Sequence, residues 1–107
     1  MAAITITDVT AAGLADIGLA AANGGGDTIA YGTEAAAGWE EYSVLLVVRN
    51  GDASSHDVTV GSLSAVTVAA GKTAIIPVPN AGENAAAVAV TYSAVTSVTV
   101  AAVRILP

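Results

Sequence analysis

Three consecutive residues, Ser55, His56 and Asp57, carry the side-chain types of a hydrolase triad. A triad needs a base that takes a proton from the nucleophile while a third group orients that base, and neighbouring residues cannot provide this spatial arrangement. His56 is the single histidine of the chain, so no second base is available. We therefore expect a polar loop here and no enzymatic activity.

Two further patterns fall short of a binding motif. Asp52, His56 and Asp57 offer metal ligands, but they lack the regular spacing and the turn glycine of an EF-hand loop. Gly71–Thr73 matches the end of a phosphate-binding loop, but Val66 stands where that loop needs its first glycine, and a strand pattern follows where it needs a helix. We expect a hairpin turn at Gly71–Thr73, and neither a metal nor a cofactor.

The acidic residues Glu34, Glu40 and Glu41 could supply the paired carboxylates of a glycoside hydrolase. Neighbouring residues of a strand point to opposite faces, however, so Glu40 and Glu41 should diverge. A solvated acidic edge is the expected outcome.

The charge balance argues against a nucleic-acid partner. Nine acidic residues stand against three basic ones, a formal net charge of −6. A protein that binds a polyanion needs clustered lysines and arginines, whereas Arg49, Lys72 and Arg104 are far apart in the sequence. The chain has no cysteine, which excludes disulfides and thiolate metal sites. We expect neither nucleic acid nor a membrane as a partner.

The hydropathy of the chain would suit a membrane protein, but its pattern does not. Hydrophobic residues make up 54% of the 107 residues; nearly half of them are alanine, and none is phenylalanine. The uncharged stretch Asn84–Val103 is long enough to span a bilayer, yet valine and threonine alternate in it, which predicts two strands and a turn. Residues 1–10 lack the basic region and long apolar run of a secretory signal.

Apolar runs separated by turn residues predict strands along most of the chain. The five consecutive apolar residues within Tyr42–Arg49 predict a central strand buried on both faces. Pro77 cannot donate to a ladder, so its strand should lie at a sheet edge or end there. Apolar positions change phase between Val98–Val100 and Val103–Ile105, which predicts a bulge near Ala101–Ala102. The predicted strands are Ala3–Val9, Asp27–Tyr31, Tyr42–Arg49, Asp57–Gly61, Ala65–Ala69, Thr73–Val78, Ala86–Tyr92 and Ser97–Ile105.

The segment Ala11–Ala22 is ambiguous. Its alanines favour a helix, but Gly13 and Gly18 oppose one, and alternate residues fit a strand. We favour a strand or extended chain.

About eight short strands without intervening helices indicate an all-β protein. We predict a single-domain antiparallel β-sandwich, a jelly roll of about eight strands, with an immunoglobulin-like sandwich as the alternative. Residues 1–22 are expected to form an N-terminal strand or arm of the same domain, and residues 23–107 the sandwich itself. Trp39 then either plugs the open end of a core built from alanine and valine, or lies in an interface or against a sugar.

The order of these elements resembles a known family. The segments GGGDTIAY, VLLVVRN, SSHDVTV, VTVAAGKTAIIPVP, VAVTYS and VTVAAVRI follow one another between residues 23 and 106. Over this range the chain is similar to the small head decoration, or cement, proteins of tailed bacteriophages, especially phages of actinobacteria. One hairpin departs from the family pattern, because Val68–Gly71 lacks the proline of a Val-Pro-Ala-Gly turn.

The resemblance implies a structural virion protein on the outside of a capsid, made in the cytoplasm of the host bacterium. Its implied partners are the major capsid protein and further copies of itself, with a trimer favoured. We expect Ile4, Ile6, Tyr31, Trp39 and Tyr42 at a capsid or subunit interface, and the N-terminal segment could pair with a neighbour by strand addition. A carbohydrate- or host-surface-binding module and a tail or head-fibre protein are the alternatives.

Overall fold

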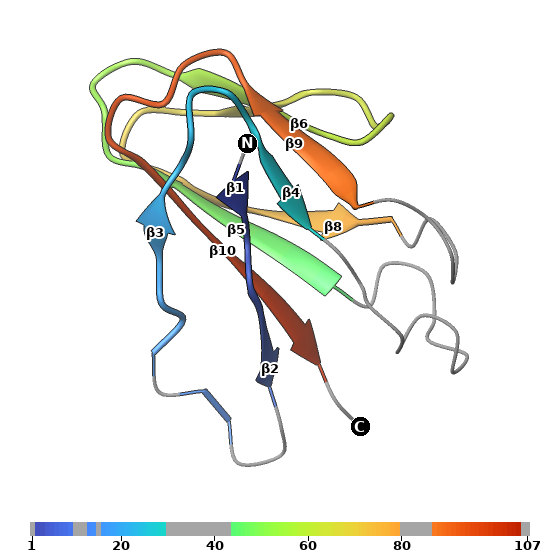
Figure 1. Ribbon diagram of the computed structural model, residues 1–107. Coiled ribbons are helices and arrows are strands. Elements are labelled where there is room, and N and C mark those ends of the chain that lie inside the picture. The colour runs from blue at the N-terminus through green and yellow to red at the C-terminus, as the bar shows by residue number, and fades with distance from the viewer. Residues whose placement is uncertain (1, 10–12, 15, 30–43, 80–86, 106–107) are drawn as a thin grey trace.

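The computed structural model describes residues 2–9, 13–14, 16–29, 44–79 and 87–105 (Figure 1). These residues form two β-sheets that face each other. Sheet A has the strand order β1-β4-β9-β6-β7, and sheet B has the order β2-β10-β5-β8, with β3 also paired to β10. The strands are β1 (Ala2–Ala3), β2 (Ile6–Val9), β3 (Ala20–Ala21), β4 (Asp27–Ile29), β5 (Val44–Asn50), β6 (His56–Val60), β7 (Val66–Val68), β8 (Thr73–Val78), β9 (Val88–Tyr92) and β10 (Val98–Ile105).

Strands β3 to β10 pair as a jelly roll. Strand β3 pairs with β10, β4 with β9, β5 with β8 and β6 with β7, all antiparallel. These nested pairs belong to one long hairpin folded over on itself, and the pairs β5–β10 and β6–β9 join it into two sheets. In an immunoglobulin-like sandwich the last two strands share a sheet, whereas β9 and β10 lie in opposite sheets. The predicted jelly-roll sandwich is therefore confirmed.

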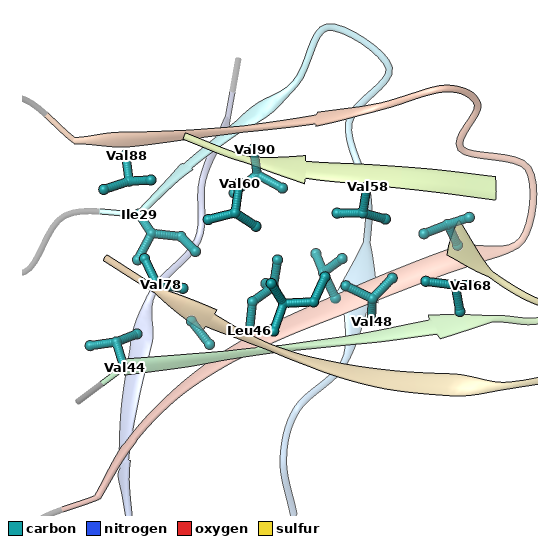
Figure 2. Packing of buried hydrophobic residues seen from close by; sticks show 14 residues of the cluster. Ile29, Val44, Leu46, Val48, Val58, Val60, Val68, Val78, Val88 and Val90 are labelled. Carbon is teal, nitrogen blue, oxygen red and sulfur yellow. The ribbon is translucent and has the colours of Figure 1, made fainter. Parts of the chain in front are cut away.

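The inner faces of the two sheets form a core dominated by valine. In β6, His56, Val58 and Val60 are buried, whereas Asp57 is exposed. This alternation is the two-residue period of a strand. Figure 2 shows side chains of β6 and β9 pointing toward those of β5 in the other layer. The core cluster comprises Ile29, Val44, Leu46, Val48, Val58, Val60, Val68, Ile76, Val78, Val88, Val90, Val98, Val100 and Ala102.

Strand β5 is a central strand whose middle is buried on both faces, as its apolar run predicts. It lies between β10 and β8. Leu46 and Val48 are fully buried in the core, and Val47 on the opposite face is only 9% exposed. A strand in this position has no face that needs to be polar, which explains the absence of alternation in the sequence.

The prediction of a bulge near Ala101–Ala102 is wrong. Val98–Arg104 pairs residue for residue with Val44–Asn50 of β5, without an interruption. Val100 belongs to the core, and Val103 lies on the opposite face yet is only 7% exposed. The apolar positions change phase because both faces of β10 are buried, so no extra residue is needed to turn the side chains inward.

Pro77 lies in β8, which among the described strands pairs only with β5. The Asn50 N–H donates to the Lys72 carbonyl at 2.9 Å. Antiparallel alternation then turns the N–H groups of Ala74 and Ile76 toward β5 and that of every odd-numbered residue outward. A proline at an outward position removes no ladder hydrogen bond, and the predicted edge strand is confirmed.

Asn50 is a fully buried polar residue at the end of β5. Its Nδ2 donates to the carbonyls of Ser54 and Val68 at 2.8 and 3.0 Å, and its Oδ1 accepts from the Asp52 N–H at 3.0 Å. Its main chain bonds to the β7–β8 turn. Since both side-chain polar atoms are satisfied, Asn50 joins three segments without an unpaired buried group.

The connection from β2 to β3 is extended in its described residues. Gly13 and Gly18 have φ angles of 82° and 69°, which no α-helix can accommodate. Ala20–Ala21 forms β3, so the preference for extended chain over helix is confirmed for the described part of Ala11–Ala22.

No helix in the described ranges is long and apolar enough to cross a membrane.

We expect Leu46→Ala to lower the free energy of unfolding by about 2–5 kcal/mol, because it leaves a cavity among side chains that are too short to fill it. Urea unfolding of the variant and the parent measures this difference. Leu45→Ala is the matched control, since this adjacent leucine is half-buried on the outer face. Equal losses for the two variants would contradict the assignment of the inner face.

Candidate functional site

The N-terminal arm, defined as residues 2–9, runs from one sheet to the other along one side of the sandwich. Strand β1 pairs in parallel with β4, and the Ile4 N–H donates to the Thr28 carbonyl at 2.8 Å. Strand β2 pairs in parallel with the second half of β10. Ile4 and Ile6 are half-buried and pack against the core. The alternation of this segment therefore gives it one apolar face that docks on the sandwich.

A groove of about 370 Å³ lies beside the arm. The arm lines one part of it, and residues 16–18, 20 and 21 line another. Asp27 of β4 and Val100 and Ala101 of β10 also line the groove. Its charged lining residues are Asp16 and Asp27, both acidic. The groove is therefore acidic and bounded mainly by short side chains.

Asp27 is a buried carboxylate of this groove, with only 2% of its surface exposed. Its Oδ2 accepts hydrogen bonds from the Tyr92 hydroxyl at 2.6 Å and from the Asn23 N–H at 3.2 Å. Burial, followed by the hydrogen bond to Asp27 and the charge of its carboxylate, raises the pKa of Tyr92 above its ordinary value. The phenol stays protonated and can donate, so the pair ties β4 to β9.

His56 is buried at the start of β6, and its partner is Asp52, with 2.9 Å between Nε2 and Oδ2. A hydrogen bond from the Ala53 N–H, followed by the contact with His56, lowers the pKa of Asp52. Asp57 is exposed, and its Oδ1 accepts from the Thr67 hydroxyl at 2.7 Å. His56 therefore pairs with Asp52, whereas Asp57 lies on the exposed face of β6 and bonds to Thr67, and the described residues contain no metal-binding cluster.

Gly71–Thr73 forms a hairpin turn, as expected. Gly71 has a φ of 73°, and the Lys72 N–H donates to the Ala69 carbonyl at 3.0 Å. Thr73 begins β8 directly after the turn. A phosphate-binding loop would continue into a helix, so this segment has a structural role.

Of the five expected interface residues, the structure places Ile4 and Ile6 together on the arm. Tyr31, Trp39 and Tyr42 lie outside the described residues, as do the candidate glutamates of the same stretch. Their expected roles stay predictions.

Asp27 and Asn50, the two least exposed of the buried polar residues, are not among the sequence candidates. Asp27 begins a predicted strand and Asn50 follows another, and both positions commonly carry turn residues. Their partners come from distant parts of the chain, Tyr92 for Asp27 and Val68 for Asn50. The sequence offers one local signal for the Asp27 contact. Tyr92 ends a predicted strand, and a tyrosine hydroxyl needs a hydrogen-bond partner when its ring is buried.

The arm is attached to the sandwich by two kinds of contact. It is held by main-chain pairing and by half-buried isoleucines. Strand addition at a sheet edge uses the same two elements, main-chain hydrogen bonds and pockets for alternate side chains.

Comparison with known proteins gave no relative: no family model, curated protein or solved structure matches the chain.

We expect Tyr92→Phe to lower the free energy of unfolding by about 1–3 kcal/mol, because the buried Asp27 carboxylate loses a donor while the ring still packs. Urea unfolding measures the loss. Asp27→Asn and the double variant complete a cycle, and the two single losses should not add because the residues are in contact. Additive losses would contradict a direct interaction.

The raised pKa of Tyr92 also predicts a pH dependence. The folded state disfavours the ionised phenol, so the stability linked to Tyr92 is fully present below the ordinary pKa of 10.0 and is lost as the pH rises above it. We expect the stability difference between the parent and Tyr92→Phe to shrink in urea titrations taken from neutral pH to beyond this value. A difference that stays constant would contradict the shift.

Proposed function

We propose that the protein is a structural virion component that binds the outside of a bacteriophage capsid and stabilises the assembled head. The resemblance of residues 23–106 to head decoration proteins supports this function. The jelly-roll pairing of β3 to β10 supports it as well, because viral capsid domains commonly have this architecture. The partners are the major capsid protein and further copies of the chain, as a trimer.

The observation that carries the proposal is the arm. Ala2–Ala3 adds to the end of sheet A, and Ile6–Val9 adds to the end of sheet B. A short segment that completes two sheets by edge pairing is suited to exchange, because an identical segment from a neighbour fits the same edges. On a capsid lattice the arm would link one copy to the next.

Exposed apolar side chains on the chain next to the arm support a partner-covered surface. Leu14 and Leu19 lie between β2 and β3, and each is 37% exposed. In Figure 1, β2 and β3 lie at one side of the sandwich, and the described chain between them extends away from the sheets. A capsid or sister subunit that buries this region would remove apolar surface from water.

Stabilisation of the head would follow from mass action. A protein that binds only the assembled, expanded lattice adds its binding free energy to that state. At a free concentration of about 100 times the Kd, each occupied site contributes about 2.7 kcal/mol. Many sites on one head would multiply this effect without any chemical step.

We expect the purified protein to co-sediment with undecorated, expanded heads and to raise the temperature at which those heads break open. Unexpanded heads of the same phage are the control and should bind more weakly. Deletion of residues 1–10 should weaken attachment, because the edge pairing of the arm is lost. Absence of co-sedimentation with expanded heads would overturn the proposed function.

A disulfide staple separates exchange of the arm from its removal. Ala3 and Thr28 face each other across the β1–β4 pair, and the chain has no cysteine of its own. Ala3→Cys with Thr28→Cys therefore introduces one bond at the spacing of neighbouring strands. If the arm exchanges, the oxidised protein should lose head binding and a reductant should restore it. Binding that is unaffected by oxidation would show that the arm stays in its own sandwich; the two single variants are the controls.

A further inference from the structure

The chain contains two Asn–Gly pairs, Asn23–Gly24 and Asn50–Gly51. The fold exposes Asn23 and buries Asn50. Asparagine followed by glycine is prone to deamidation, because glycine has no Cβ to hinder attack by its main-chain nitrogen. We propose that Asn23 is a site of spontaneous deamidation and isoaspartate formation, and that the fold protects Asn50 from the same reaction.

The reaction passes through a cyclic imide. The Gly24 nitrogen gives its proton to hydroxide and attacks Cγ of Asn23. A C–N bond forms to close the ring, and the bond from Cγ to the amide nitrogen breaks, so that this nitrogen leaves as ammonia with a proton from water. Water then opens the imide at either carbonyl, which gives aspartate or isoaspartate. No oxidant or reductant takes part.

Both sites share the hydrogen bond that would activate the amide. The Gly25 N–H donates to Oδ1 of Asn23 at 2.9 Å, and the Asp52 N–H donates to Oδ1 of Asn50 at 3.0 Å. Negative charge develops on this oxygen when the nitrogen attacks Cγ, and an N–H group already directed at it stabilises that charge. The two sites therefore differ in how the attacking main-chain nitrogen and the leaving amide nitrogen are held, and in their access to water.

At Asn50 the attacking and leaving atoms are both held. The Gly51 N–H donates to the Ser97 carbonyl at 2.9 Å. The amide nitrogen that would leave donates to Ser54 and Val68 at 2.8 and 3.0 Å. Asn50 is also fully buried, so hydroxide and water reach it only when the segment opens.

At Asn23 the same atoms are unrestrained. Asn23, Gly24 and Gly25 are all exposed. Neither the Asn23 amide nitrogen nor the Gly24 N–H bonds to another residue in the part of the chain that the structure describes. Attack and departure therefore break no native hydrogen bond of these two groups.

The product alters the turn that leads into β4. The Asn23 carbonyl accepts from the Gly26 N–H at 2.9 Å, and the Asn23 N–H donates to the buried Asp27 carboxylate at 3.2 Å. In isoaspartate the main chain runs through the former side chain, which lengthens the turn and takes that carbonyl out of it. A new negative charge also appears near Asp27. Deamidation would therefore loosen the β3–β4 turn beside the groove.

Cleavage of the chain after Arg49 and Lys72 allows an unambiguous measurement. It releases one peptide whose only amide side chain is Asn23 and another whose only amide side chain is Asn50. After the folded protein is incubated in mildly alkaline buffer, we expect a mass increase and isoaspartate in the first peptide. The second should react at least about tenfold more slowly, because it must wait for local opening. Equal rates, or a faster reaction at Asn50, would overturn the proposal.

Two controls assign the difference to the fold. In urea both pairs lose their native contacts, so the two rates should become similar. Gly24→Ala should slow the reaction at Asn23 several-fold while preserving the structure, since the added Cβ would meet only Val95 Cγ2 at an ordinary 3.7 Å. A rate difference that persists in urea, or a Gly24→Ala protein that reacts like the parent, would show that the proposed cause is wrong.

Discussion

Main-chain pairing along strand β10 holds β2, β3 and β5 together in sheet B. One edge of β10 bonds to β5, and the other bonds to β3 and β2. Segments from the beginning and the middle of the chain therefore meet on its last strand. Because β10 is buried on both faces, its N–H and C=O groups need partners on both edges. The arm and the groove both lie along the edge that β2 and β3 share, so the candidate site is a consequence of this pairing.

The composition of the chain determines what surrounds this frame. Valine dominates the core, and Ile29 and Leu46 are its largest fully buried side chains. Small β-branched residues pack well on a pleated sheet but bury little area each. Buried hydrogen bonds therefore also hold segments in place. Asn50 joins β5 to β7 and to the loop between β5 and β6, and Asp27 joins β4 to Tyr92 of β9. These polar contacts lie at strand ends, where the apolar core stops.

The proposed function and the proposed modification both concern the side of the sandwich formed by the arm, β3 and β4. The arm supplies edges that a neighbour could share, and the turn that begins at Asn23 lies between β3 and β4. Asp27 connects the two, because it lines the groove and accepts from the Asn23 N–H. Asn23 and Gly24 of this turn are exposed, which leaves the Asn–Gly pair open to water.

The fold class and most strand positions follow from the amino-acid sequence alone, because the alternation of side chains along a strand is a local property. Pro77 likewise indicated an edge from its own missing N–H. The three-dimensional arrangement sets which strands pair, since register depends on residues far apart in the chain. The position of Val103 in the sequence predicts a bulge, but both faces of β10 are buried and no bulge forms. The three-dimensional arrangement also sets the polar contacts. Nothing near Asp27 or Asn50 predicts Tyr92 or Val68 as a partner, because a buried hydrogen bond forms only after folding has brought its two halves together.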